Sequence, residues 1–404
     1  MNIELFLQNI ISKMMEKISP ENLMKRSKHL WKKYIPKEVS VIAVGKSSVP
    51  MLRGIIEEGY RIKRGIVVTT KEFGHMAKNF ENVEVFVSSH PIPNEISLKA
   101  AQRAMDILRK EDFVLFLISG GGSSLMEYPA IDFDEYIGIV KKAIYSGLDI
   151  HRLNALRRYL SRIKGGKILR EAKSKVISLI LSDVPGNYLE DIASGLTFYE
   201  TKEYDYVKRI AERIGLDLDK YSLPKPVTQE EFRNFKVRNF VIGGIYSSTK
   251  SLKKIFSQMN IPCRILGNRF CGEAKELGKF VGSLSHLAGE VIILGGEWEV
   301  RIDGPSGIGG PNLELVLSSF LTKDENSVIV SLGTDGVDGN SPAAGGFAFG
   351  KKDVEEIVEY LNAHNSYEFM KKIGGTIETG PTGTNLADVC FLIPSNIIRS
   401  GIPL

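Results

Sequence analysis

Short apolar runs recur along this chain, and segments with a helical period separate them. Five such runs lie in the first half of the sequence, at residues 39–44, 64–70, 83–89, 113–119 and 175–182. Between two of them, residues 97–111 carry apolar side chains at the spacing of a helix. Strands that alternate with helices are typical of a layered α/β fold built on a parallel sheet. We therefore predict an α/β fold with parallel strands in the first half of the chain.

A second series of the same kind follows residues 221–239, where the apolar pattern lapses and two prolines interrupt the chain. Its apolar runs lie at residues 240–248, 262–268, 291–300, 327–336 and 387–395. A chain of 404 residues is also too long for one ordinary hydrophobic core. The sequence therefore predicts two α/β domains, at residues 1–236 and 237–404.

Composition and charge exclude several classes of protein. The net charge of +5 is small for this length and does not call for nucleic acid. The three cysteines form no CxxC pair, and the histidines lack metal-binding spacing. No apolar stretch approaches the length of a membrane span, and the first eighteen residues have the pattern of an amphipathic helix rather than a signal peptide. We expect a cytoplasmic protein that binds neither nucleic acid nor a membrane.

The apolar run at residues 113–119 leads directly into a glycine-rich segment. It consists of Gly120, Gly121, Gly122, Ser123 and Ser124. Glycine loses more backbone entropy on folding than other residues, so three glycines in succession are costly and indicate a functional or structural requirement. Bare backbone N–H groups can wrap an anion, usually a phosphate, although a tight turn is the plain alternative.

Four other predicted strands also end in glycine beside a polar group, at residues 44–48, 182–187, 295–299 and 333–340. In open α/β sheets, ligands bind beyond the carboxyl ends of the strands. One such loop would be unremarkable, but five in one chain predict an active site.

Lys46 follows the first apolar run. Ser47 or Ser48 is placed to cap the next helix, and Pro50 would lie in its first turn. The GKS sequence is not the end of a P-loop, because the first glycine of that motif would fall on Ser40. A lysine at a strand end, beside a helix N-terminus, suits an anionic ligand. A solvated surface lysine is the alternative.

Residues 151–175 hold nine lysines and arginines but a single acid, Glu171. Leucine and isoleucine residues fall at helical spacing in this stretch, so we expect part of the basic run to lie on an exposed helix face. No aromatic-rich platform for nucleic acid accompanies it. A small ligand that bears a phosphate fits better.

Asp183, Asp335 and Asp338 follow predicted strands and lie close to glycines. This is the setting of carboxylates that hold Mg²⁺ beside substrate phosphates, although each alone could be a turn residue. With the glycine loops, they favour phosphoryl transfer. A serine hydrolase is disfavoured because there is no GxSxG elbow, and a nicotinamide enzyme because SGGGSSL lacks the last glycine of GxGxxG.

Motifs along nearly the whole chain are similar to those of one family. They are GKSS (45–48), SSHPIPNEIS (88–97), SGGGSSL (119–125), NALRRYLSRIKGG (154–166), LSDVPGNYLEDIASGLT (181–197), GGEWEV (295–300), GTDGVDGNSPAAGG (333–346) and TGPTGTNLADV (379–389). The chain resembles the glycerate 2-kinase family, whose C-terminal half is the MOFRL domain. The resemblance implies ATP-dependent, Mg²⁺-requiring phosphorylation of D-glycerate, mainly at the 2-hydroxyl. It also implies an N-terminal Rossmann-like domain, a C-terminal α/β domain of the MOFRL type, and an active site in the cleft between them.

The family's functional lysine falls on Lys46. Its functional arginine, in a Gly-Gly-Arg-Asn-x-Glu pattern, does not carry over, because Pro311 stands in its place while Asn312 and Glu314 match. We expect another cation to compensate, and we prefer Arg157 to Arg301, because Arg157 lies in a stretch that matches the family.

The predicted site combines these assignments. Lys46 and Arg157 neutralise anionic charge, and the backbone of residues 120–124 cradles an anion, either a phosphate of ATP or the glycerate carboxylate. Asp335 and Asp338 hold Mg²⁺, and Asp183 or Asp191 orients or deprotonates the hydroxyl. The remaining binding residues implied by the matching motifs are Asn187, Glu297, Asn312, Glu314, Thr382 and Asn385.

Two other functions remain open at this point, a hydroxypyruvate reductase and a catalytically inactive nucleotide-binding regulatory protein. The expected partners are D-glycerate and a nucleotide, and a homodimer is one assembly that the sequence allows.

Overall fold

The chain forms two compact units in the computed structural model, which describes residues 3–77, 80–173, 175–302 and 304–400. The N-terminal unit comprises Pro20–Ser182 and Asn187–Ile242, and the C-terminal unit comprises Met1–Ser19, Asp183–Gly186 and Gly243–Leu404. The predicted domain boundary lies between residues 236 and 237. The N-terminal unit ends nearby, at Ile242. The first helix and the short segment Asp183–Gly186 belong to the C-terminal unit, which a single cut in the sequence does not anticipate.

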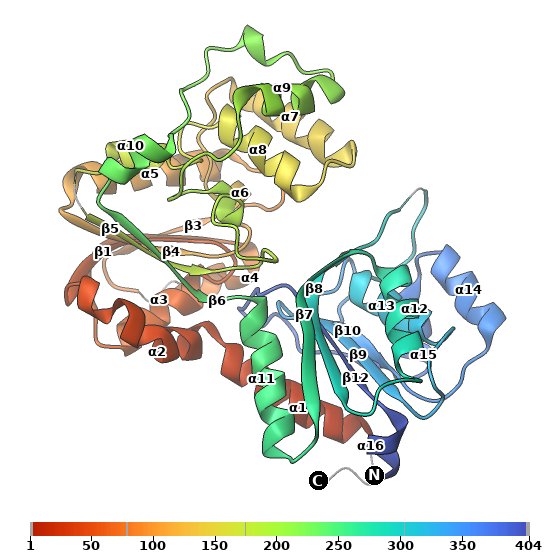
Figure 1. Ribbon diagram of the computed structural model, residues 1–404. Coiled ribbons are helices and arrows are strands. Elements are labelled where there is room, and N and C mark those ends of the chain that lie inside the picture. Colours follow the sequence, from red (N-terminus) through yellow and green to blue (C-terminus); the bar gives the residue numbers. More distant parts are fainter. Residues whose placement is uncertain (1–2, 78–79, 174, 303, 401–404) are drawn as a thin grey trace. The chain divides into compact units, whose positions relative to one another are not determined.

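The N-terminal unit is built on a six-stranded sheet in the order β3-β2-β1-β4-β5-β6 (Figure 1). Its strands are β1 (Glu38–Val44), β2 (Arg61–Thr69), β3 (Val83–Val87), β4 (Phe113–Ile118), β5 (Lys175–Leu181) and β6 (Val237–Gly243). The pairings among β1 to β5 are parallel, as predicted. This strand order is that of the Rossmann fold, and its direction of winding reverses between β1 and β4. Ligands of such sheets bind at that switch point, beyond the carboxyl ends of the two strands.

Helices cover this sheet and extend beyond it. They are α2 (Pro20–Trp31), α3 (Ser48–Glu57), α4 (Lys71–Gly74), α5 (Glu95–Lys110), α6 (Gly122–Leu125), α7 (Phe133–Tyr145), α8 (Ile150–Leu160), α9 (Tyr204–Arg213) and α10 (Gln229–Asn234). Helix α3 packs on β1, β2 and β4, and α5 packs on β2 and β3 (Figure 1). Strands β1 and β4 are buried over nearly their whole length, which explains why they read as continuous apolar runs.

The C-terminal unit has a second six-stranded sheet, in the order β11-β10-β9-β12-β8-β7. Its strands are β7 (Cys263–Glu273), β8 (Val291–Glu299), β9 (Val328–Gly333), β10 (Gly345–Ala348), β11 (Thr376–Ile377) and β12 (Asp388–Ile393). Only β7 and β8 pair in parallel; the other four pairings are antiparallel. The antiparallel β12 therefore begins at the edge where β8 and β9 end.

The helices of this unit are α1 (Ile3–Ile18), α11 (Ile245–Gln258), α12 (Ala274–Leu284), α13 (Pro311–Ser319), α14 (Val354–Asn362), α15 (Ser366–Lys372) and α16 (Ser395–Arg399). Helix α11 packs on β7, β8 and β12 and also contacts α1, while α13 packs on β8, β9 and β10 (Figure 1). In the part of the chain that the structure describes, no helix is both long and apolar enough to cross a membrane.

One predicted strand was assigned to the wrong sheet. Residues 240–248 were expected to open the second α/β series, but β6 (Val237–Gly243) is the last strand of the first sheet, and α11 begins at Ile245. As an edge strand, β6 is mostly half-buried, so its apolar pattern does not reveal which sheet it joins.

Candidate functional site

The loops that follow β1 and β4 are tied together at the switch point of the first sheet. The backbone N–H of Lys46 donates to the carbonyl of Gly120 at 2.9 Å. The N–H of Ser47 donates to Ser119 Oγ, also at 2.9 Å. The structure thus brings Lys46 and the glycine loop, Ser119–Ser124, together at the switch point.

Two glycines of these loops have backbone conformations that side chains disfavour. Gly45 has φ +126°, and a Cβ placed on it would lie 2.1 Å from Ser119 Oγ. Gly121 has φ +82°, and its Cβ would lie 3.2 Å from His90 Cδ2 and 3.4 Å from Lys46 Cγ. Because glycine has no side chain, these two residues let the loops after β1 and β4 approach each other closely. They also leave the backbone beside Lys46 and His90 uncovered by a side chain.

Gly45→Ala should lower the free energy of unfolding by about 2–4 kcal/mol, since it adds backbone strain and a clash with Ser119. Gly59→Ala is the matched control: Gly59 has φ +80° but nothing within 4 Å of its Cβ, so only the strain applies. Urea denaturation measures both variants. Equal losses would show that the contact between the two loops contributes nothing.

Three cationic or titratable side chains surround the glycine loop. Burial, with the charges of Lys46 and Arg157, lowers the pKa of His90 to about 4, so that His90 is neutral at physiological pH. Arg157 is 5% exposed and donates from Nη2 to the carbonyl of Pro91 at 3.2 Å. Its buried Nε has no hydrogen-bond partner in the described part of the chain. A buried donor without a partner is uncommon and marks a place where a ligand acceptor would fit.

The basic stretch at residues 151–175 is only partly exposed: Arg152 on α8 is half-exposed, but several other basic side chains that were expected at the surface are buried. Its buried cations are Arg157, Arg158, Lys164 and Lys167. The helix ends at Leu160, so helical spacing does not apply to the second half. Arg158 pairs with Asp191 and Glu200, at 3.2 and 2.8 Å. Burial is tolerated because such cations find carboxylate or carbonyl partners.

Lys164 lies within a buried polar cluster beside the glycine loop. Its Nζ donates to the carbonyl of Met126 at 3.0 Å and lies 3.6 Å from Glu127 Oε2. Glu127 also accepts from Tyr136 Oη at 2.6 Å and from Ser161 Oγ. The cluster fixes the segment that leaves the loop against the segment that follows α8.

Lys164→Met should lower the free energy of unfolding by about 3–5 kcal/mol, because it leaves the Glu127 charge buried without its cation. The double variant Lys164→Met/Glu127→Gln, which removes both charges, should lose clearly less. Denaturant titration of both variants tests this. A double variant at least as unstable as Lys164→Met alone would contradict the pairing.

Asp191, a predicted catalytic acid, is held by three residues of α8. Its Oδ1 accepts from Arg158, and its Oδ2 lies 2.6 Å from Nδ1 of His151. Asn154 Nδ2 donates to the backbone carbonyl of Asp191 at 3.2 Å. Both carboxylate oxygens are thus engaged by the protein itself.

The segment after Asp191 packs on the glycine loop. A Cβ on Gly122 would lie 2.8 Å from the Cβ of Ala193, and Ser194 Oγ lies 2.8 Å from Ser123 Oγ. Ala193, Ser194 and the exposed Asn187 all have positive φ, at 49°, 53° and 56°. Strained non-glycine backbone of this kind clusters at functional sites.

The other predicted residues lie in the C-terminal unit, around the N-terminus of α13. Asp338 Oδ1 accepts from the N–H and side-chain amide of Asn312, and its Oδ2 accepts from the N–H of Leu313. Burial raises the pKa of Asp338 to about 7. Asn312 Oδ1 accepts in turn from Trp298 Nε1. Asp338 is thus held by the first turn of α13, and its assignment to Mg²⁺ stays a prediction.

Asp335 and Asp388 converge on the end of β9. A Cβ on Gly333 would lie 3.3 Å from Asp335 Oδ1 and 3.4 Å from Asp388 Oδ1. Asp388 pairs in register with Gly333 and Gly296, because β12 runs antiparallel between β9 and β8. Burial raises the pKa of Asp388 well above its usual range, and the negative charges of Asp338, Glu297 and Asp335 raise it further.

Asp388 was not predicted as a site residue, although it falls within the motif TGPTGTNLADV (379–389). An acid at the start of a strand carries no signal unless the strand is known to be antiparallel. In the described ranges, no set of three or more His, Cys, Asp or Glu side chains forms a preformed metal site. Two carboxylates suffice where substrate phosphates complete the Mg²⁺ shell, so Asp335 and Asp388 fit that ion.

The remaining predicted residues are distributed around these acids. Thr382 donates from its backbone N–H to the carbonyl of Asp335, and its hydroxyl donates to the carbonyl of Thr334. Asn385 donates to Asp183 Oδ2 at 3.3 Å. Glu314 is instead buried in the unit, with Oε1 2.7 Å from His364 Nδ1. Glu297 is exposed at the end of β8, and Pro311 is the first residue of α13.

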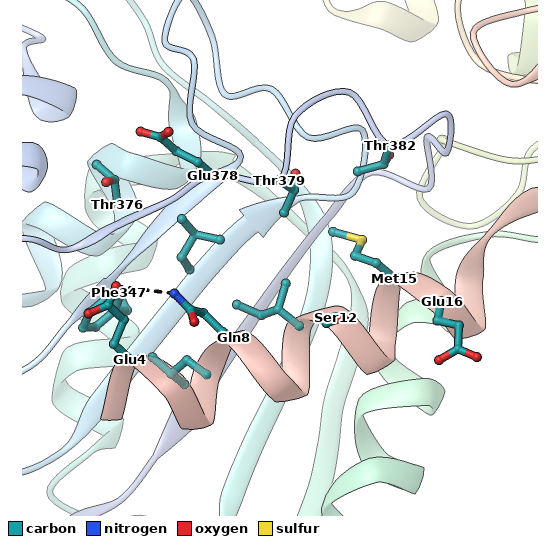
Figure 2. Close-up of a pocket in the computed structure, with 13 residues that line it drawn as sticks. Glu4, Gln8, Ser12, Met15, Glu16, Phe347, Thr376, Glu378, Thr379 and Thr382 are labelled. Atoms are coloured by element: carbon teal, nitrogen blue, oxygen red, sulfur yellow. Dashed lines mark hydrogen bonds between the residues drawn. The ribbon is translucent and has the colours of Figure 1, made fainter. Parts of the chain in front are cut away.

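A cavity of about 570 Å³ lies in the C-terminal unit, between α1 and the segment from β11 to Thr382 (Figure 2). Its rim carries the polar side chains of Glu4, Gln8, Glu16 and Glu378. The lining includes three glutamates but no lysine or arginine. A triphosphate would meet only negative charge there, so this cavity is not the predicted anion site.

Two family models match different parts of the chain. Residues 6–229 match the model described as "Domain of unknown function (DUF4147)", and residues 290–388 match the MOFRL family. The chain is 35% identical to the glycerate 2-kinase of Pyrococcus horikoshii, over 93% of this chain and 91% of that protein. It is 31% identical to a protein of Agrobacterium vitis provisionally named hydroxypyruvate reductase, over 86% of this chain and 85% of that one.

The fold is also that of a solved structure. The crystal structure of glycerate kinase from Thermotoga maritima matches with a TM-score of 0.81 and 28% identity, over 96% of this chain and 98% of that chain. The sequence motifs, the Rossmann order of the first sheet and these similarities agree. The chain belongs to the glycerate 2-kinase family, in which a DUF4147 domain precedes a MOFRL domain.

Proposed function

We propose that this protein is a glycerate 2-kinase, which transfers the γ-phosphoryl group of ATP to the 2-hydroxyl of D-glycerate. The observation that carries the proposal is the crevice at the switch point, where Lys46, Arg157 and the bare backbone of Gly121 surround a neutral His90. Such a crevice suits an anion, and both substrates are anions. Membership of the kinase family supports the same conclusion.

Phosphoryl transfer needs positioning and neutralisation of charge more than covalent chemistry. Lys46 and Arg157 supply positive charge, and the N–H groups of the glycine loop contact the anion through backbone. Arg157 stands in for the family arginine that Pro311 replaces. Its buried Nε supports this assignment, because this donor has no acceptor among the residues that the structure describes.

Mg²⁺ would be held by Asp335 and Asp388 of the C-terminal unit. A bound Mg²⁺ neutralises charge on the phosphates of ATP. Burial is the main cause of the raised pKa of Asp388, and the negative charges of Asp338, Glu297 and Asp335 add to it, so a bound cation would relieve that repulsion. Thr382 holds the carbonyl of Asp335, and thereby the turn that carries this carboxylate. The use of ATP also favours a cytoplasmic location.

A hydroxypyruvate reductase is the second candidate, because one relative carries that name. Reduction by a nicotinamide cofactor requires a dinucleotide-binding loop, for which GxGxxG is the usual form. Here Leu125 stands where the third glycine belongs, and it is buried in the short helix α6. The kinase is therefore the function that the site supports best.

The two functions separate in one pair of assays. We expect D-glycerate-dependent release of ADP from ATP when Mg²⁺ is present, and none after EDTA is added. Oxidation of NADH or NADPH by hydroxypyruvate, with no ATP-dependent reaction, would overturn the proposal in favour of the reductase. ATP should also raise the melting temperature, because a ligand that binds only the native state stabilises it.

A further inference from the structure

His151 lies one turn before Asn154 on α8 and forms a carboxylate–imidazole pair with Asp191. Its Nδ1 is 2.6 Å from Asp191 Oδ2. The His151 side chain is 50% exposed, whereas that of Asp191 is 7% exposed. A half-exposed imidazole held by a buried carboxylate has the arrangement of an oriented proton acceptor.

The hydrogen bond determines which ring nitrogen carries the proton. An ionised carboxylate only accepts hydrogen bonds, so Nδ1 of His151 must be the donor to Asp191. In the neutral imidazole, Nε2 is then left with a lone pair. Nε2 makes no hydrogen bond to any residue that the structure describes, and it can therefore accept a proton from a ligand.

Asp191 is fixed for this orienting role. Arg158, whose side chain is fully buried, donates from Nη1 to Asp191 Oδ1 at 3.2 Å and from Nε to Glu200 at 2.8 Å. Asn154 holds the backbone carbonyl of Asp191. Each carboxylate oxygen of Asp191 thus already has a donor from α8, which suits an orienting role better than that of the group that receives the substrate proton.

The pair lies beside the glycine loop. Asn154 Oδ1 accepts from Ser194 Oγ at 2.9 Å, and that hydroxyl lies 2.8 Å from Ser123 Oγ in the loop. Ala193, two residues after Asp191, packs against Gly122. One turn of α8 and three residues of chain therefore connect His151 to the loop that would hold the anion.

We propose that His151 is the general base of the reaction and that Asp191 is its positioning residue. This inference rests on the proposed kinase function. Nε2 of His151 takes the proton of the glycerate 2-hydroxyl as the oxygen forms a bond to the γ-phosphorus of ATP. The bond from that phosphorus to the β,γ-bridging oxygen breaks, and ADP leaves with the electron pair. The carboxylate of Asp191 stabilises the imidazolium, which then releases its proton to solvent.

The direct test is the kinetics of His151→Ala. General base catalysis contributes about a hundredfold or more, so kcat should fall by about that factor, with little change in the KM for glycerate or ATP. Added imidazole should restore part of the lost kcat. His29→Ala is the control, because His29 is an exposed histidine on α2 of the same unit and should keep full activity, with or without imidazole.

The outcomes separate this inference from the function on which it rests. A wild type without glycerate-dependent turnover would remove the proposed function itself. An active wild type, together with a His151→Ala variant of unchanged kcat, would overturn the general base and leave the kinase intact. A rise in KM alone, or a loss of kcat that imidazole does not restore, would also overturn it and make His151 a binding or structural residue. Melting temperatures equal to that of the wild type would show that the variants are folded.

Discussion

Arg157→Ala should lower kcat by about a thousandfold, the larger of the two major effects that we expect. Phosphoryl transfer spreads negative charge over the equatorial oxygens, and a well-placed arginine can supply about that factor or more. Pro311, at the position of the family arginine, has neither a side-chain donor nor a backbone N–H. The buried Nε of Arg157 has no hydrogen-bond partner in the residues that the structure describes, while its Nη2 donates to the carbonyl of Pro91. Steady-state kinetics with saturating ATP and glycerate measures the loss.

Arg301→Ala is the matched control for this prediction. Arg301 follows β8 in the C-terminal unit and is exposed, so we expect no comparable loss of kcat. Arg157→Lys should be intermediate, because lysine keeps the charge but not the guanidinium geometry. If both alanine variants keep a near-normal kcat, the role of the arginine is filled elsewhere or is unnecessary in this enzyme.

Lys46→Ala should lower kcat and kcat/KM together, by about a hundredfold. A cation that stabilises charge in the transition state contributes to both quantities, whereas uniform substrate binding would change only KM. Lys46 is half-buried at the end of β1, and its backbone is fixed by Gly120. The free energy of unfolding should hardly change, because the side chain lies outside the hydrophobic core.

The control for Lys46 is Lys25→Ala, which removes an exposed lysine from α2 in the same unit. It should leave both kinetic constants unchanged. Full kcat in Lys46→Ala would show that this residue is an ordinary surface lysine. A raised KM with unchanged kcat would limit it to binding of the ground state.

The inner strands of the first sheet could be predicted because they are buried on both faces. Burial of this kind produces continuous apolar runs such as residues 39–44 and 113–118, and parallel strands place the following loops at one edge. The crevice of Lys46 and Gly120–Gly122 follows from that rule. The edge strand β6 was predicted for the wrong sheet, because a half-buried strand does not encode its partner.

The site in the C-terminal unit was less predictable, because its sheet is mixed. Asp388 reaches the end of β9 only because β12 is antiparallel, and a sequence pattern does not give strand direction. Asp338 looks like a metal ligand in the sequence, yet its oxygens cap α13. In the same way, His151 lies outside any recognised motif and acquires a partner only through the fold, which brings Asp191 to α8.

Identification of the phosphorylated product by ³¹P NMR tests the central claim most directly. The purified protein would be incubated with ATP, Mg²⁺ and D-glycerate, and the spectrum compared with those of the two phosphoglycerate isomers. The account predicts 2-phosphoglycerate and ADP, formed in equal amounts and only when glycerate is present. Formation of 3-phosphoglycerate would contradict the assigned position of transfer, and an unchanged ATP spectrum would contradict the kinase itself.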